Sequence, residues 1–208
     1  MSGGIGIFGG TFNPIHLGHL HAAGQVRVAF CLDKILFVPS YIPPHKDARD
    51  VAAAADRFRM VELACLGHDG FEASPIEVEA REKSYSILTL DKVREIYPKA
   101  RVFFIVGVDA FLEIGTWHEV DRVLERSLFI VTGRPGFDLD AAPGVLGGRL
   151  ADRIHPVHGG EDIDETFFSR FSIFLLPIKA LDISSTDIRD RFRHGGSAEG
   201  LVPEPVAE

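Results

Sequence analysis

The sequence predicts an α/β fold with one doubly wound, Rossmann-like parallel sheet, forming a single domain over residues 1–208. Short apolar runs alternate with longer segments of helical periodicity, which is the pattern of parallel strands joined by crossover helices. A chain of 208 residues has the size of one domain and can bury a core of its own. The 46% hydrophobic and 25% charged content is typical of a globular domain and agrees with this prediction.

Apolar runs predict the strands of the sheet, and they cover residues 5–8, 34–39, 101–106, 128–132 and 173–176. The Ile-Leu-Phe-Val run within 34–39 is continuous, as expected for a strand that helices cover on both faces. We expect residues 76–80 to add a short strand.

Helical character predicts helices over residues 20–30, 52–66, 87–97 and 119–126. Within 52–66, Phe58, Val61 and Ala64 with its neighbour Cys65 recur at core spacing. Residues 133–165 are rich in glycine, proline and acids, so we expect a peripheral loop region there. Ligands of doubly wound sheets bind beyond the carboxyl ends of the strands, at the topological switch point.

A glycine-rich turn follows the first strand, in the segment GGTFNPIHLGH at residues 9–19. Glycines such as Gly9 and Gly10 allow backbone N–H groups to approach a bulky anion. The start of the following helix favours negative charge, and His16 and His19 add donors that can become cationic. The segment therefore predicts a phosphate-binding site.

Other interpretations of this segment remain open at this point. The dinucleotide fingerprint and the P-loop motif are both absent, so the turn could simply be tight, with histidines capping a helix. Closely spaced histidines can also bind a metal. The spacing of His16 and His19 is i, i+3 with a glycine between, however, unlike the H-E-x-x-H pattern of zinc hydrolases, so no metal site is predicted.

A second strand–loop–helix junction lies near the other end, in ISSTDIR at residues 183–189. Ser184 to Asp187 fits the capping-box pattern, and Arg189 follows about one turn later. An ordinary capped helix with a solvated arginine would explain this segment alone. Two helix starts suited to anions in one small α/β domain favour a binding function instead.

Together, these motifs resemble the paired signatures of the HxGH nucleotidyltransferase superfamily, and within it the bacterial nicotinate-nucleotide adenylyltransferases. The resemblance extends over nearly the whole chain, through PPHK at 43–46, SYSILTL at 84–90, GVDAF at 107–111, Trp117 and RPG at 134–136, in the order of the family. It implies transfer of the adenylyl group of ATP to nicotinate mononucleotide, giving deamido-NAD and pyrophosphate.

Chemistry with these substrates makes few demands on the protein. The attacking phosphate is ionised near neutrality because its second pKa is about 6, so no general base or covalent intermediate is required. The reaction needs two polyanions to be aligned and their charge to be neutralised. We expect Mg²⁺ to arrive with ATP and to keep several of its waters, so no protein-held metal site is expected.

The resemblance implies the following site residues. Catalysis is assigned to His16, His19 and Arg189. ATP binding is assigned to Gly9, Gly10, Thr11, Phe12, His16, Gly18, His19, Gly107, Asp109, Ile183, Ser184, Ser185, Thr186 and Arg189. Mononucleotide binding is assigned to Gly10, Thr11, His45, Lys46, Tyr85, Ser86, Trp117, His118 and Arg134.

Several of these assignments have a structural alternative. His45 and Lys46 could form a solvated loop, Asp109 could be a helix N-cap, and Trp117 could be a core residue. The family usually has threonine where this chain has Ser86, and its members vary where this chain has His118.

Bulk properties limit the partners. The formal net charge of −8 gives no broad basic face for nucleic acid. No apolar run approaches the ~20 residues of a membrane span, and the first strand leaves no room for a signal peptide, so a cytoplasmic location is expected.

Cys31 and Cys65 are not spaced as a redox or zinc motif, and we expect buried reduced thiols. A homo-oligomer is compatible with the sequence, which does not indicate one.

Rival functions remain. The chain could be another HxGH transferase acting on nicotinamide mononucleotide, phosphopantetheine or a cytidylyl substrate, or a nucleotide-sensing module without turnover. The HPVH segment, with His155 and His158, could hold a metal, although a polar loop favours unliganded histidines.

Overall fold

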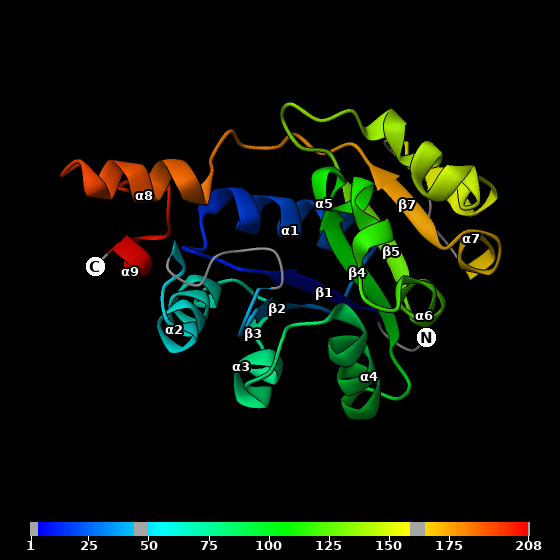
Figure 1. Ribbon diagram of the computed structural model, residues 1–208, viewed down its shortest axis with the longest axis horizontal. Helices are drawn as coiled ribbons and strands as arrows, with labels where there is room; N and C mark the ends of the chain where they lie inside the picture. Colours follow the sequence, from blue (N-terminus) through cyan, green and yellow to red (C-terminus); the bar gives the residue numbers. More distant parts are fainter. Residues whose placement is uncertain (1–3, 44–49, 159–164, 208) are drawn as a thin grey trace.

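A computed structural model describes residues 4–43, 50–158 and 165–207, and its strands form one seven-stranded sheet in the order β3-β2-β1-β4-β5-β7-β6 (Figure 1). Every neighbouring pair of strands is parallel, which confirms the predicted architecture. The strands are β1 (Gly4–Gly10), β2 (Lys34–Pro39), β3 (Phe71–Ala73), β4 (Arg101–Gly107), β5 (Leu128–Thr132), β6 (Ile154–Pro156) and β7 (Ile173–Leu176).

The strand order reverses direction between β1 and β4. From β1 the chain adds β2 and β3 on one side, then crosses to the other side of β1 to form β4. Phe8 of β1 pairs with Ile105 of β4, so the two strands end side by side, at Gly10 and Gly107. This is the topological switch point at which doubly wound sheets bind ligands.

Helices cover both faces of the sheet (Figure 1). One apolar core involves α1 (Leu17–Ala29), α2 (Ala54–Cys65) and α7 (Glu165–Arg170). The other involves α4 (Ser86–Ile96), α5 (Val108–Leu112) and α6 (Val120–Arg126), with the short helix η2 (Ile114–Thr116). The remaining helical elements are α3 (Ile76–Ala80), η3 (Leu139–Gly148), η4 (Ala151–Arg153), α8 (Ser185–Arg193) and α9 (Glu204–Ala207).

Alternate residues of the central strands enter opposite cores. In β2, Ile35 and Phe37 belong to the core under α1 and α2, whereas Leu36 and Val38 belong to the core under α4 and α5. All four side chains are buried. Because helices cover both faces of such a strand, neither set of alternate residues is exposed to water. This explains the continuous apolar runs.

The expected strand at 76–80 is wrong, because these residues form helix α3. The strand lies just before it, at β3, which pairs with β2. Ile-Glu-Val-Glu-Ala alternates as a strand would, but Pro75 occupies the N-cap position and Ala80 completes a single helical turn. Five residues are too few to distinguish the two-residue period of a strand from the 3.6-residue period of a helix.

The region expected to be peripheral loop contains more structure than its composition suggests. Residues Ala142, Val145 and Leu150, from η3 and the link to η4, are buried in the α4–α5 core. Strand β6 then adds to the edge of the sheet beside β7. The strand is only three residues long and ends in proline, so its sequence carries no strand signal.

The expected burial of the cysteines is wrong for Cys31. That residue is exposed, in a left-handed turn with φ 48° directly after α1. Cys65 is partly buried, and burial raises the pKa of its thiol to about 12. Both are free thiols.

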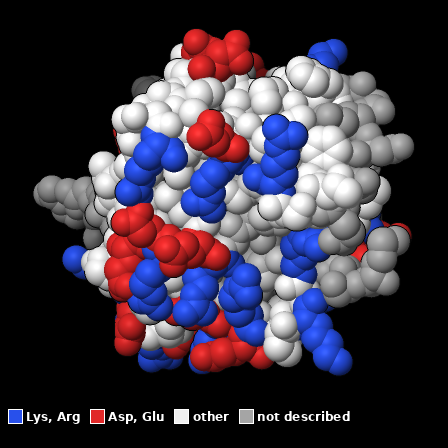
Figure 2. Space-filling model, turned by 90° about the vertical axis from the view of Figure 1, so that its right-hand side faces the viewer, with Lys and Arg blue, Asp and Glu red and all other residues white. Residues whose placement is uncertain are grey.

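In the described ranges, none of the helices combines the length and the apolar character needed to cross a membrane. Figure 2 shows the side of the molecule that lies at the right of Figure 1. On this face, acidic and basic side chains are interspersed.

Candidate active site

The two motifs from opposite ends of the chain meet above the sheet, where α8 lies beside the start of α1 (Figure 1). The Ser185 hydroxyl donates to the Pro14 carbonyl at 2.9 Å. A guanidinium N–H of Arg189 donates to the Asn13 carbonyl, also at 2.9 Å. These two bonds join the segment after β1 to the first residues of α8.

The turn after β1 is anchored by its own aromatic side chain. Phe12 has φ 46° and is buried as a whole residue, with its ring in the core under α1 and α2. The ring packs against Phe37 of β2 at 5.9 Å and against His19 at 5.1 Å between centroids. The ring is held in this packing, so the predicted contact of Phe12 with phosphate would need its backbone, and that contact stays a prediction.

His16 and His19 lie together at the start of α1. Their rings are stacked with centroids 3.7 Å apart, and the backbone N–H of His16 donates to Nδ1 of His19 at 3.2 Å. Gly18 lies between them, where a Cβ would come within 3.0 Å of Nδ1 of His16. A larger residue at this position would push the His16 ring by a few tenths of an ångström.

His16 is buried, with 6% of its surface exposed. Burial, and secondly the positive charge of Arg134, lower its pKa to about 4. Within the described part of the chain, Nδ1 of His16 has no hydrogen-bond partner. The imidazole is therefore neutral near pH 7 in the substrate-free protein, and only an added anion would favour its protonated form.

The start of α8 has the predicted cap. Ser184 is the N-cap residue, and its hydroxyl oxygen accepts the backbone N–H of Asp187 at 3.1 Å. The Ser184 hydroxyl in turn donates to the Asp187 carboxylate at 2.7 Å. One turn later, Arg189 donates to the Thr186 hydroxyl at 3.3 Å, while its buried Nε has no partner among the described residues. Arg189 is therefore anchored by hydrogen bonds to Asn13 and Thr186, and part of its hydrogen-bonding capacity is unused within the described residues.

Asp109 and Arg134 form an ion pair at the end of β4. The Arg134 guanidinium donates to Oδ2 of Asp109 at 2.5 Å, while the buried Oδ1 has no partner in the described ranges. A Cβ on Gly107 would lie 2.5 Å from this Oδ1, so a larger residue there would move the carboxylate from its present position. Asp109 is not the N-cap of α5, because Gly107 occupies that position.

Two of the segments predicted for the mononucleotide, the start of α4 and the residues after η2, are in contact. Tyr85 is the N-cap of α4 and Ser86 is its first residue. The Tyr85 ring lies 4.4 Å from the ring of His118. Trp117 is partly buried and packs edge-on against Phe104 at 5.6 Å. His45 and Lys46 lie outside the described residues.

Sequence reasoning missed Arg57 of α2. This arginine is 1% exposed, and it donates to the backbone carbonyl of Thr11, in the glycine-rich turn, at 2.7 Å. Its only sequence signal is its spacing from Val61 and Ala64, both buried, which puts a charged residue on the apolar face of a helix.

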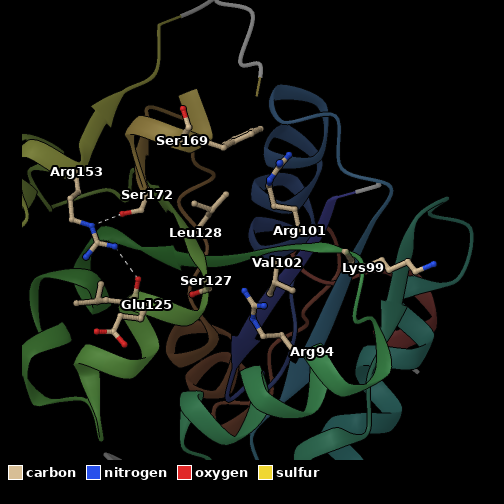
Figure 3. A pocket seen from close by; sticks show the side chains of 13 residues that line it. Arg94, Lys99, Arg101, Val102, Glu125, Ser127, Leu128, Arg153, Ser169 and Ser172 are labelled. Carbon is tan, nitrogen blue, oxygen red and sulfur yellow. Dashed lines mark hydrogen bonds between the residues drawn. The ribbon is translucent and has the colours of Figure 1, made fainter. Parts of the chain in front are cut away.

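A cavity of about 500 Å³ lies at the opposite end of the strands from this site (Figure 3). Its lining includes Arg101 and Leu128, which are the first residues of β4 and β5. Arg153 crosses one wall and donates to the Ser172 hydroxyl at 2.9 Å. This cavity faces the amino ends of the strands and contains none of the predicted site residues.

Within the described ranges, no three His, Cys, Asp or Glu side chains group closely enough to hold a metal ion. His155 of the HPVH segment packs among aromatic rings, with Phe171 at 4.8 Å and Phe167 at 4.9 Å.

The chain is similar to a protein family and to individual proteins that are named for one activity. A model of the cytidylyltransferase-like family matches residues 7–191. A protein of Desulfitobacterium hafniense (strain Y51), named "Probable nicotinate-nucleotide adenylyltransferase", is 40% identical over 203 residues, covering 97% of this chain and 90% of that protein. A protein of Moorella thermoacetica with the same name is 41% identical over 209 residues, covering 99% and 88%.

Solved structures share the fold at low sequence identity. The Plasmodium falciparum nicotinic acid mononucleotide adenylyltransferase complexed with NaAD matches with a TM-score of 0.70 at 18% identity, over 99% of this chain and 93% of that one. The family match over residues 7–191 and the relatives at 40% and 41% identity show that the chain belongs to the cytidylyltransferase-like family, among the nicotinate-nucleotide adenylyltransferases.

Proposed function

We propose that the protein transfers the adenylyl group of ATP to nicotinate mononucleotide, releasing pyrophosphate and deamido-NAD. The observation that carries this proposal is the meeting of the His16–His19 turn with the start of α8 at the switch point of the sheet. Two helix starts, two imidazoles and an arginine there offer donors to a polyphosphate chain. The names of the sequence relatives support the same reaction.

We assign the ATP phosphates to this meeting point. The backbone of residues 9–12 and the start of α1 face the α-phosphate, with His19 as the donor to its oxygens. Arg189 and Thr186 hold the outer phosphates, because the guanidinium of Arg189 has N–H groups beyond those that bond to Asn13 and Thr186, and these can donate to phosphate oxygens. The already bonded Ser185 hydroxyl ties α8 to the turn, so in this proposal it acts mainly through its backbone.

The chemical step then needs no protein nucleophile. A phosphate oxygen of the mononucleotide forms a bond to the α-phosphorus of ATP, and the bond from that phosphorus to the bridging oxygen breaks, with both electrons leaving on pyrophosphate. Charge grows on the leaving group, and fixed donors aimed at it lower the barrier. Mg²⁺ enters with ATP as part of the substrate and offsets the charge of its phosphates.

We place the mononucleotide beside Tyr85, Ser86, Trp117 and His118, with its phosphate near the glycine-rich turn. Arg134 is held by Asp109 and lies close enough to His16 to lower its pKa, so it can serve that phosphate. His45 and Lys46 are assigned to the same phosphate from the family resemblance. Asp109 is assigned to the ATP ribose.

Pyrophosphate release tests the proposal. ATP with nicotinate mononucleotide should give rapid release, CTP in place of ATP should give little, and omission of the acceptor should give none. His19→Ala serves as the inactive control. Rapid release with CTP or with phosphopantetheine would assign the chain to another transferase reaction. ATP binding without release under any of these conditions would indicate a sensing module.

A further inference from the structure

Residues 40–42 connect the two halves of the proposed site. The backbone N–H of Ser40 donates to the carbonyl of Gly10, at the end of β1, at 2.9 Å. On the other side, the carbonyl of Ile42 accepts the backbone N–H of Ser84 at 3.2 Å. This segment is therefore bonded both to the ATP-facing turn and to the residues that lead into α4.

The peptide groups of Tyr41 are held from both sides. Its N–H donates to the hydroxyl oxygen of Ser84 at 2.8 Å. Its carbonyl accepts from a guanidinium N–H of Arg57 at 3.2 Å. A shift of residues 40–42 toward either neighbour would break one of these bonds.

Arg57 holds three separate backbone segments with one side chain. Besides Tyr41, its guanidinium donates to the carbonyl of Thr11 at 2.7 Å and to that of Ala52 at 2.9 Å. All three acceptors are neutral carbonyls on connecting segments. A guanidinium presents several N–H groups in a rigid planar fork, and lysine has no equivalent geometry.

A partly buried carboxyl group closes the network. Glu77 of α3 accepts from the Thr89 hydroxyl at 2.5 Å, and a hydrogen bond from Ser84 favours its charged form. Burial raises the pKa of Glu77, and these bonds together with the charge of Arg57 oppose the rise. The Glu77 carboxyl group therefore lies close enough to Arg57 for their charges to interact, and its hydrogen bond fixes the Ser84 hydroxyl that holds Tyr41.

We propose that Arg57, acting with Ser84, is a positioning residue that fixes the ATP-facing turn relative to the mononucleotide-facing start of α4. The proposal rests on the proposed function for the identity of the two subsites. Transfer requires an oxygen held by one subsite to approach a phosphorus held by the other, and a misplacement of about 1 Å can cost about a hundredfold in rate. Arg57 is almost fully buried, so it acts through the backbone.

Arg57→Lys keeps the charge and removes the fork. We expect kcat to fall about 10- to 100-fold, while the separate dissociation constants of ATP and of the mononucleotide stay within about threefold of wild type. Arg59→Lys is the matched control on the same helix, because Arg59 is 66% exposed and pairs only with Glu62 in the described ranges, and it should change neither quantity. An unchanged kcat in Arg57→Lys would overturn the proposal, whether or not the variant binds the two substrates more weakly.

Ser84→Ala provides a second variant, which carries the test if Arg57→Lys fails to fold. It removes the acceptor of the Tyr41 N–H, so kcat should fall in the same manner but less. The combined variant should lose less than the product of the two single losses, since both act on one segment. Fully multiplicative losses would indicate two unrelated structural effects.

Hydrogen exchange at the Tyr41 amide needs no substrate, so it separates this proposal from the proposed function. We expect the amide to exchange at least about tenfold faster in Ser84→Ala and in Arg57→Lys than in wild type or Arg59→Lys. Equal exchange in all four proteins would overturn the positioning role, even if adenylyl transfer is confirmed. A wild type that transfers to no pyridine mononucleotide would overturn the proposed function, even with the exchange difference intact.

Discussion

The backbone N–H of His16 donates to Nδ1 of His19, and the two imidazole rings stack with centroids 3.7 Å apart. Because Nδ1 of His19 is an acceptor, the proton of its neutral ring is on Nε2. The first helix thus sets the tautomer of His19 through a backbone bond. The buried His16 ring lies against it as a second, neutral imidazole.

His19→Ala should leave the fold intact and lower kcat by about 10²–10⁴, the range for a donor aimed at developing charge. The measurement is steady-state pyrophosphate release, with circular dichroism to verify folding. His21→Ala, on the same helix, is the matched control, since the His21 ring forms a hydrogen bond with the Lys179 carbonyl and is not assigned to either substrate. A well-folded His19→Ala variant with near-normal kcat would remove His19 from the chemical step.

Arg189→Ala should weaken ATP more than the mononucleotide. The arginine is assigned to the outer phosphates, which the mononucleotide lacks. Separate titrations of the two substrates measure the effect. Arg193→Ala is the control on the same helix, because Arg193 is exposed and pairs with Asp190. Equal losses for the two substrates, or a loss confined to the mononucleotide, would mean that the assignment is reversed.

His16 should make stability depend on pH. Its pKa is about 4 in the folded protein and near 6.5 in the unfolded chain, so between these values the unfolded state binds a proton that the folded state does not. The contribution is complete above pH 6.5 and is lost as the pH falls to 4, by at most roughly 3 kcal/mol. Urea unfolding of wild type and His16→Gln between pH 4 and 7 measures it. Equal pH slopes in the two proteins would contradict the neutral, buried imidazole.

Acceptor choice should favour the acid over the amide. A carboxylate in the ring pocket can accept several hydrogen bonds, whereas the NH₂ of a carboxamide would face those donors and leave them unpaired. Each buried group left unpaired costs about 1–3 kcal/mol, so kcat/KM should favour nicotinate mononucleotide by about ten- to several-thousand-fold over nicotinamide mononucleotide.

Two variants separate the contributions to this preference. Trp117→Ala should reduce activity with both acceptors alike, because stacking does not distinguish a carboxylate from an amide. Ser86→Ala should reduce activity with the acid more. Equal use of both acceptors by the wild type would refute this pocket, although adenylyl transfer itself would stand.

The sequence predicts the central strands well, because burial on both faces leaves a continuous apolar run, as in 34–39 and 128–132. It fails at 76–80, where the five alternating residues are compatible with a strand or with a helix. Pro75 at the N-cap position favours the helix. The cap at Ser184 is confirmed because it is local. Arg57 escapes prediction because its three acceptors come from parts of the chain that only the fold brings together.

The bonds from Ser185 to Pro14 and from Arg189 to Asn13 span 171 and 176 positions of the chain. Contacts of such high sequence separation are entropically expensive to close and tend to form late in folding. During synthesis the sheet can pair its first strands while α8 is still inside the ribosome. The phosphate-facing surface would therefore be assembled last, so folding intermediates would already contain most of the core but would not yet bind ATP.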